Sequence, residues 1–245
     1  MHTLVLLALA LLSPSAVHPL AQAAAPTQQP SSVVPVPRTD EGILPRQEEC
    51  LKRARETASA KVVFVGDSIT QGWEGAGARV WKEALEPLGA LDLGVSGDRT
   101  EHVLWRLGQA PLTRLQPKAI VLLIGTNNLG HGSSDAAQTL LGIQRVVAVL
   151  REQCPAARLL VLDVFPRGER FNAMRGDIAQ INQVLAGMDD GKLVRCLRVG
   201  DRFVEEDGSI RKEIMPDFLH LSETGYRMWA DALVPHLREA LAEKH

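Results

Sequence analysis

A serine, a histidine and an aspartate in this chain have the residue types and spacing that nucleophilic catalysis requires. Ser68 ends the sequence Gly66-Asp67-Ser68, directly after a short apolar run. A serine hydroxyl is a weak nucleophile until a neighbouring base removes its proton. Of the seven histidines, His220 alone has a carboxylate set up to orient it, because Asp217 precedes it by three residues. A tight turn at this spacing brings the carboxylate to the imidazole, where it fixes the tautomer and stabilises the imidazolium.

Two further residues have the chemistry of an oxyanion hole. Asn127 carries a side-chain amide that can donate to a developing oxyanion. Gly97 has no Cβ, so its backbone N–H is free to approach a substrate. The N–H of Ser68, at the expected start of a helix, is a third donor. Taken singly, each has an alternative interpretation, because glycine and asparagine are common in turns, serine is a common N-cap, and Asp-x-x-His also occurs in surface loops.

These residues follow strands of a predicted parallel sheet. One of five short apolar runs, AIVLLI, is apolar throughout, which is typical of a strand buried on both faces of a parallel sheet. Helical patterns separate the runs, and this alternation predicts an α/β three-layer sandwich with a five-stranded parallel sheet and a flavodoxin-like strand order. The runs are 62–65, 90–93, 119–124, 159–164 and 193–199. The helical patterns are 48–58, 79–85, 99–107, 135–150 and 175–185, with a last helix starting near Ser222.

The first three apolar runs end in small or polar residues, at 66–68, 94–98 and 125–128. In open α/β sheets, ligands bind beyond the carboxyl ends of the strands. We therefore expect these three loops to converge. Two further residues near them are candidate substrate contacts: Trp73, five residues after Ser68, and Arg167, in a loop that faces the site. The alternatives are core packing for Trp73 and a solvated loop position for Arg167.

Composition excludes several classes of protein. The chain has 245 residues, 45% hydrophobic and 23% charged, which fits one soluble domain. A formal net charge of -2 argues against a nucleic-acid binder. The sequence has no phosphate-binding loop motif and no cysteine or histidine cluster with metal-site spacing. Cys50, Cys154 and Cys196 permit one disulfide in an oxidising compartment, with all three pairings open; the alternative is that all three are buried thiols.

The N-terminal stretch differs in composition from the rest of the chain. Residues 4–12 form an apolar run too short to span a bilayer, and small residues follow at 21–23. This pattern predicts a cleaved signal peptide over 1–23 and a secreted or periplasmic protein without a membrane span; the alternative is a disordered apolar tail. Residues 24–40 are rich in proline, alanine and serine and are predicted to be a linker. The folded domain is expected over 41–245.

The order of the motifs resembles a known family. Gly-Asp-Ser, a glycine after the second strand, Gly-Thr-Asn-Asn and Asp-x-x-His occur in the order found in SGNH (GDSL-type) hydrolases. The Ser, Gly, Asn and His of that name are here Ser68, Gly97, Asn127 and His220. Longer stretches, LGVSGDRTEHVLWRL, VLLIGTNNLGH and DFLHLSETGY, resemble the catalytic α subunits of type I platelet-activating-factor acetylhydrolases and their bacterial relatives. This resemblance covers about residues 60 to 240.

The resemblance implies a serine esterase that hydrolyses short-chain acyl esters, acetyl esters above all, through an acyl-serine intermediate. Ser68 would be the nucleophile, His220 the base and Asp217 its orienting acid, with Ser68, Gly97 and Asn127 as oxyanion donors. The resemblance implies that catalysis needs neither metal nor cofactor. It also implies that the substrate is a small ester of an acetylated carbohydrate or lipid. Alternatives are a thioesterase or lysophospholipase on the same scaffold, or a non-catalytic carbohydrate-binding module. The oligomeric state is open, with a homodimer among the alternatives.

Overall fold

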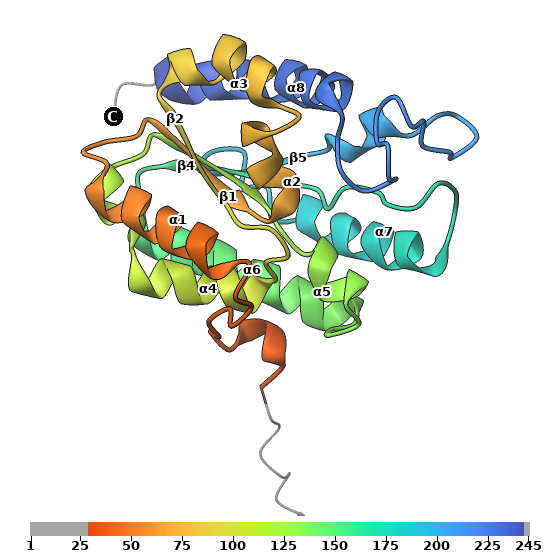
Figure 1. The fold of residues 1–245 in the computed structure, drawn as a ribbon, viewed down its shortest axis with the longest axis horizontal. Helices are drawn as coiled ribbons and strands as arrows, with labels where there is room; N and C mark the ends of the chain where they lie inside the picture. The colour runs from red at the N-terminus through yellow and green to blue at the C-terminus, as the bar shows by residue number, and fades with distance from the viewer. Residues whose placement is uncertain (1–28, 243–245) are drawn as a thin grey trace, which may run out of the picture.

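The computed structural model describes residues 29–242 and contains one β-sheet between two layers of helices (Figure 1). The strand order is β2-β1-β3-β4-β5, and all neighbouring strands are parallel. The predicted three-layer sandwich with a five-stranded, flavodoxin-like sheet is thereby confirmed. The predicted signal peptide over 1–23 lies outside the described residues. The strands are β1 (Val62–Gly66), β2 (Ala90–Gly94), β3 (Ala119–Leu123), β4 (Arg158–Leu162) and β5 (Val194–Leu197).

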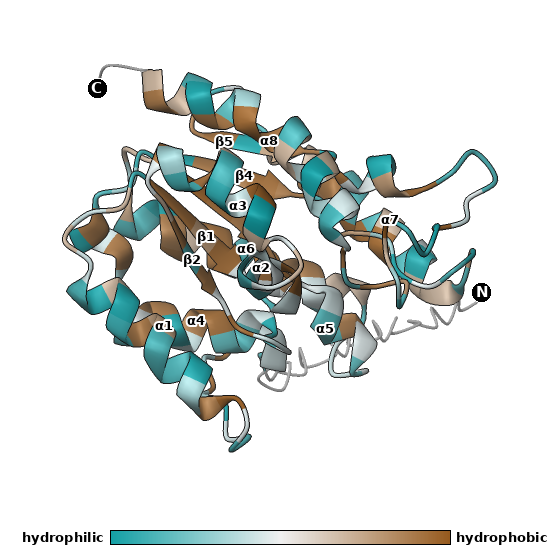
Figure 2. Ribbon diagram, turned by 45° about the horizontal axis from the view of Figure 1, so that its top comes forward, coloured by the Kyte–Doolittle hydropathy of each residue, from teal (hydrophilic) through white to brown (hydrophobic). Residues whose placement is uncertain are grey.

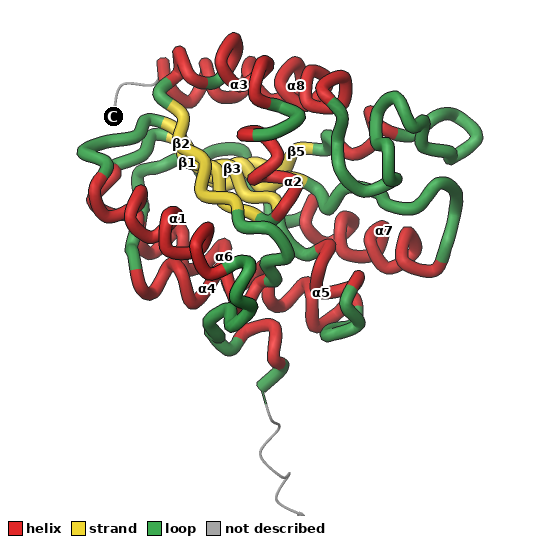
Figure 3. Tube along the Cα trace, in the orientation of Figure 1, coloured by secondary structure: helices red, strands yellow, loops and turns green. Residues whose placement is uncertain are grey.

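Helices cover both faces of the sheet (Figure 3). One face is covered by α1 (Leu44–Glu56), α4 (Thr100–Gln109), α6 (Ala136–Gln153) and α7 (Ala173–Ala186), and the other by α3 (Ala78–Ala84) and α8 (Glu223–Ala242). No helix within residues 29–242 is both long and apolar enough to cross a membrane. Short helices follow β1 and β3, and turns of 3-10 helix fill the connections. They are α2 (Ser68–Gln71), α5 (Thr126–Gly130), η1 (Ser31–Val33), η2 (Gly72–Glu74), η3 (Glu86–Leu88), η4 (Leu112–Leu115) and η5 (Gly200–Phe203).

The core lies on both faces of the sheet. Along β1, Val63 and Val65 belong to the cluster under α1, α4, α6 and α7, whereas Val62 and Phe64 belong to the cluster under α3 and α8. Successive side chains of a strand point to opposite faces, so both sets are buried only because both faces are covered. The hydrophobic colouring of the central strands in Figure 2 reflects this double burial.

Local signals account for the starts of several helices. The Asp135 side chain accepts a hydrogen bond of 2.8 Å from the N–H of Gln138, which caps α6. Ser222 Oγ accepts from the N–H of Gly225 at 3.3 Å, so α8 begins where the sequence predicts. α1 begins four residues earlier than the predicted 48, at Leu44, because a proline fits its first turn.

Residues 29–40 pack on the domain, and we call this segment the N-terminal strap. It belongs to the predicted linker over 24–40, of which residues 24–28 lie outside the described part. Ser32 is fully buried, its hydroxyl donates to the carbonyl of Gln138 at 2.6 Å, and its own carbonyl accepts from Thr100 Oγ1 at 2.8 Å. The Val36 N–H donates to the carbonyl of Glu101 at 3.2 Å. Such contacts leave no periodic pattern, because they are made by single polar atoms to distant helices.

All three cysteines are free thiols. Cys50 and Cys154 are buried, Cys196 is partly buried, and burial raises the pKa of each thiol to about 11. A thiol that stays protonated is a poor nucleophile and packs as a small apolar group. The cysteines therefore contribute to the core rather than to a bridge.

Candidate active site

Ser68, His220 and Asp217 form one line of hydrogen-bond contacts. His220 Nε2 lies 2.9 Å from Ser68 Oγ, and His220 Nδ1 lies 2.7 Å from Asp217 Oδ2. When Nδ1 carries the proton, it donates to Asp217, and Nε2 can accept the Ser68 proton. The structure thus brings together all three residues of the predicted triad, across 152 positions of sequence.

The loop before α8 holds the acid and the base in one turn. Asp217 Oδ1 accepts from the backbone N–H of His220 at 2.7 Å and of Leu219 at 3.1 Å. Between them, Phe218 has φ of 59°, in the left-handed region that non-glycine residues rarely adopt. The N–H of Gly168 donates to the Phe218 carbonyl at 2.8 Å and ties this loop to the one after β4. The three-residue spacing works because this conformation folds the imidazole back over the carboxylate.

The Asp217 carboxylate is held in its charged form. Burial raises its pKa, but hydrogen bonds from the His220 side chain and from two backbone N–H groups outweigh that effect, so the pKa lies below its usual range. The Asp217 side chain is 56% exposed and that of His220 is 44% exposed. Both side chains are therefore partly exposed to solvent.

Ser68 is the first residue of α2, at the carboxyl end of β1. Asp67 precedes it, is completely buried, and accepts from the Ile69 N–H at 2.9 Å as the cap of this turn. Burial raises the pKa of Asp67 to about 7, and the nearby Asp98 carboxylate adds to the rise. Gly66 must be glycine, because a Cβ there would overlap Thr70 Oγ1 and the backbone of β3. This tight packing directs Ser68 out of the strand toward His220.

The candidate oxyanion donors come from the loops after β2 and β3. Gly97 has φ of 74°, a conformation that glycine adopts without strain. Within residues 29–242, the N–H groups of Gly97 and Ser68 have no hydrogen-bond partner. Asn127 is 6% exposed, and its amide donates to the carbonyl of Asp98 at 3.0 Å. This bond ties Asn127 to the loop that carries Gly97. Because β1 pairs in parallel with both β2 and β3, the loops that follow these three strands lie at the same edge of the sheet, as predicted.

Buried polar residues that the sequence analysis did not single out support these loops. Arg106 donates to Asp98 Oδ2 at 2.9 Å and to the carbonyl of Leu93 at 3.0 Å. Asn128 accepts from the Thr100 N–H at 3.0 Å and thereby joins α5 to α4. Both residues lie inside the matched motif stretches, but their types alone carry no signal for this role, which depends on buried carbonyls and N–H groups.

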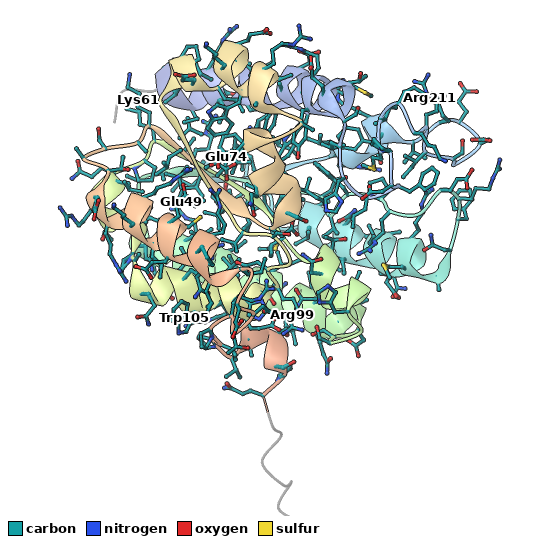
Figure 4. The ribbon with its side chains drawn as sticks, viewed as in Figure 1. Glu49, Lys61, Glu74, Arg99, Trp105 and Arg211 are labelled. Atoms are coloured by element: carbon teal, nitrogen blue, oxygen red, sulfur yellow. The ribbon has the colours of Figure 1, made fainter. Side chains whose placement is uncertain are left out.

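An open hollow of about 460 Å³ borders Ser68. Its lining carries no apolar side chain: Ser68, Gln71, Gly72, Glu74, Gly75 and Ser96. Glu74 is fixed at its edge by Arg46, at 2.8 Å and 3.1 Å, and by Arg53. Arg53 also bonds Glu49 of α1, and Figure 4 shows Glu49 and Glu74 close together across this ion-pair network. The side chains at the edge of the cavity are therefore polar, and the one charged group among them is paired with arginines.

Trp73 does not line this cavity, so the prediction that it contacts substrate is wrong. Its side chain is fully buried in the core under α3 and α8. Its ring centroid lies 4.5 Å from that of Tyr226, 4.8 Å from that of Trp229 and 6.2 Å from that of Phe64. The turn η2 rotates the indole away from the cleft and onto the sheet, where burying a large apolar ring is favourable.

Arg167 lies beside the triad. Its guanidinium donates to the carbonyl of Thr126 at 3.2 Å and is close enough to Asp67 and Asp217 to interact with both charges. Burial lowers its pKa, and the two carboxylates act in the opposite direction. A half-buried cation at this position can contact a bound substrate, and that role stays a prediction.

Comparison with known proteins agrees with this geometry. The sequence model of the GDSL-like Lipase/Acylhydrolase family matches residues 64–228. The chain belongs to this family. The GDSL-like acylhydrolase described here is 39% identical over 184 residues to human platelet-activating factor acetylhydrolase IB subunit alpha1, covering 75% of this chain and 78% of the relative. It is 39% identical over 166 residues to the rat alpha2 subunit, covering 67% and 70%.

Solved structures show the same fold in this acylhydrolase at low identity. A GDSL-like lipase from Bacteroides thetaiotaomicron has a TM-score of 0.66 and 18% identity, covering 79% of this chain and 98% of that one. An acetyl-xylooligosaccharide esterase from Geobacillus has a TM-score of 0.58 and 16% identity, covering 76% and 96%. With the family match and the curated relatives, the chain is a carboxylic ester hydrolase.

Proposed function

We propose that this acylhydrolase is a serine esterase that removes short acyl groups, above all acetyl, from hydroxyl-rich alcohols such as carbohydrates. The observation that carries the catalytic part is the contact line from Asp217 Oδ2 through His220 to Ser68 Oγ, at 2.7 Å and 2.9 Å. Nucleophile, base and orienting acid in hydrogen-bond reach are the arrangement that activates a serine for acyl transfer.

The proposed reaction has two halves. Ser68 Oγ attacks the ester carbonyl while His220 Nε2 takes its proton, and Asp217 stabilises the imidazolium. The N–H groups of Ser68 and Gly97 and the amide of Asn127 stabilise the negative charge on the carbonyl oxygen. His220 then gives the proton to the leaving alcohol, and an acyl-serine remains. Water, deprotonated by His220, releases the acid and restores Ser68.

The polar lining of the cavity supports a short acyl group and a hydroxyl-rich alcohol. Each buried methylene of an acyl chain is worth about 0.8 kcal/mol, but only against an apolar wall. Gln71, Glu74 and Ser96 are polar instead, and polar side chains of this kind suit hydroxyls. The names of the platelet-activating factor acetylhydrolase relatives and of the acetyl-xylooligosaccharide esterase both specify acetyl.

Hydrolysis of nitrophenyl esters from acetate to decanoate tests the proposal. We expect kcat/KM to be highest for acetate, and Ser68→Ala to lower kcat by at least about 10³-fold with KM little changed. Ser209→Ala is the matched control, because that hydroxyl contacts Asp207 on the surface and should leave kcat unchanged. Near-wild-type turnover by Ser68→Ala would remove the assignment of the nucleophile. A rise of about tenfold toward octanoate would instead favour a thioesterase or lysophospholipase.

We also propose that the protein is exported, with cleavage near residue 23. The short apolar run at 4–12 and the small residues at 21–23 support this. N-terminal sequencing of protein from the source cell should find a mature chain beginning near residue 24. An intact Met1 on protein from the cytosol would contradict export.

A further inference from the structure

The N-terminal strap reaches the loop that carries Gly97. Arg38, near the end of the strap, has a side chain that is only 10% exposed. Its Nη1 donates to the carbonyl of Ser96 at 2.9 Å and lies 3.4 Å from Asp98 Oδ1. Its Nε donates to Asp40 at 2.8 Å, which sets the angle of the guanidinium. The contact to Ser96 concerns one peptide bond, the one between Ser96 and Gly97.

That peptide bond carries the candidate oxyanion donor. No cis peptide occurs in residues 29–242, so the Ser96 carbonyl and the Gly97 N–H point in opposite directions from one plane. Arg38 holds the carbonyl end. The N–H end consequently points away from Arg38.

Two hollows border this segment. Arg38 and Gly97 line one of about 300 Å³, whereas Ser68 and Ser96 line the cavity in front of the nucleophile. A second bond fixes the same segment, since the Ser96 N–H donates to Gln71 Oε1 at 2.8 Å. Ser96 is therefore held at its N–H by Gln71 and at its carbonyl by Arg38.

We propose that Arg38 is a positioning residue that orients and polarises the Ser96–Gly97 peptide, so that the Gly97 N–H points at the oxyanion of the acyl-transfer step. Without Arg38, the peptide plane is free to rotate, because a glycine at φ of 74° tolerates the alternative conformations. A cation on the carbonyl also strengthens the N–H of the same amide as a donor, because linked hydrogen bonds polarise one another. Arg38 thus acts on the Gly97 loop from a segment that lies outside the motifs that carry the chemistry. This inference rests on the proposed function, in which Gly97 stabilises an oxyanion.

Arg38 also has an effect on stability, which the experiment must distinguish from its effect on the Gly97 N–H. It is one of two arginines on the buried Asp98 carboxylate, the other being Arg106, so its loss removes part of the compensation of a buried charge. If Arg38 serves only this ion pair, its loss lowers the stability of the protein and leaves kcat unchanged. If Arg38 orients Gly97, its loss lowers kcat and weakens the binding of an oxyanion, and KM stays unchanged.

The test compares three variants of the full-length enzyme: Arg38→Ala, Arg38→Lys and Ser32→Ala. Ser32→Ala is the control, since it removes an anchor of the strap on α6 and touches neither the Gly97 loop nor the triad. The readouts are kcat and KM for nitrophenyl acetate, the melting temperature, and the inhibition constant of a trifluoromethyl ketone. That inhibitor adds to a catalytic serine and places an oxyanion where the reaction does.

We expect Arg38→Ala to lower kcat by about 10-fold to about 100-fold, less than deletion of an oxyanion donor, with KM changed by under about threefold. The inhibition constant should rise by the same factor as kcat falls. Arg38→Lys should recover part of both, and Ser32→Ala should keep wild-type kcat at a lower melting temperature. If Arg38→Ala does not fold, Arg38→Lys and Arg38→Gln carry the same comparison.

Three outcomes would overturn the inference: wild-type kcat in Arg38→Ala, a loss confined to KM with an unchanged inhibition constant, or an equal loss of kcat in Ser32→Ala. Each of them leaves the proposed function intact as long as Ser68→Ala is inactive. An active Ser68→Ala variant refutes the proposed function itself, whatever Arg38→Ala does.

Discussion

The Asp217→Asn variant distinguishes two effects of Asp217: its orientation of His220 and its contribution to the stability of the loop. Asparagine is close in shape to aspartate, and its Oδ1 can still accept from the N–H groups of Leu219 and His220, at 3.1 Å and 2.7 Å in the wild type. Its Nδ2 then replaces Oδ2 and faces His220 Nδ1, 2.7 Å away in the wild type. Two donors cannot face each other, so Nδ1 must give up its proton and Nε2 must carry one. In that tautomer, Nε2 donates and cannot take the proton of Ser68.

The expected loss follows from this geometry. The tautomer effect in a buried triad lowers kcat by about 10⁴-fold, and a Ser-His-Asp protease is the worked example. Here the carboxylate is 56% exposed, so water screens its charge on the imidazolium and the electrostatic part of the loss is smaller. We therefore expect kcat to fall by between about 10² and about 10⁴-fold, which corresponds to about 3 to about 5 kcal/mol of activation free energy.

Stability should change far less than activity. An exposed hydrogen bond contributes about 1 kcal/mol, so the melting temperature of Asp217→Asn should stay within a few degrees of wild type. The assay is kcat for nitrophenyl acetate above neutral pH, with circular dichroism of the same samples. Asp207→Asn is the matched control, since Asp207 accepts hydrogen bonds from Ser209 in a surface loop and lies 3.8 Å from Arg170. An Asp217→Asn variant with more than about a tenth of wild-type kcat would refute the role given to the carboxylate.

Three further predictions concern the loops and the core. Gly97→Ala should lower both kcat and the melting temperature, because an alanine at φ of 74° is strained and its Cβ meets the Arg38 guanidinium; unchanged kinetics would contradict this. Trp229→Ala should cost about 3 to about 5 kcal/mol of unfolding free energy in urea, since the indole is fully buried among aromatic rings, and a loss under 1 kcal/mol would mean that the core collapses around it. Asp92 is buried, and burial raises its pKa to about 7, so its contribution to stability is present at acid pH and is lost as pH rises through 7. Melting temperatures of Asp92→Asn and wild type from pH 5 to pH 8 should therefore diverge in favour of the variant as pH rises, and a constant difference would exclude the effect.

The sequence contained the parts of the fold and site that depend on strong local patterns. The run AIVLLI predicts β3 because a strand buried on both faces has no polar positions. The triad was predictable because Asp217 and His220 are close in sequence, and because Ser68 directly follows a strand in a parallel sheet. A helix start at Ser68 was expected, whereas the short helix α5 was not predicted, since five residues make no helical period.

Directions of side chains and packing of irregular segments required the structure. Trp73 is five residues from Ser68, and only the η2 turn decides that its indole enters the core. Arg38 lies in a stretch with the composition of a linker, and its importance comes from one carbonyl 58 positions away. Polar contacts at such separations leave no periodicity and no composition signal along the chain.

The Asp217–His220 turn has a consequence for how such an enzyme diversifies. Acid and base lie within four consecutive residues, and the hydrogen bonds that fix their mutual geometry are almost all made inside that turn. The pair is therefore a self-contained module, and the sheet has only to deliver the serine to it. Insertions in the loops after β4 and β5 can reshape the surrounding surface without disturbing the module, provided that the bond from Gly168 to Phe218 keeps it in place. The turn that carries acid and base is thus a segment separate from the loops that shape the surface around it.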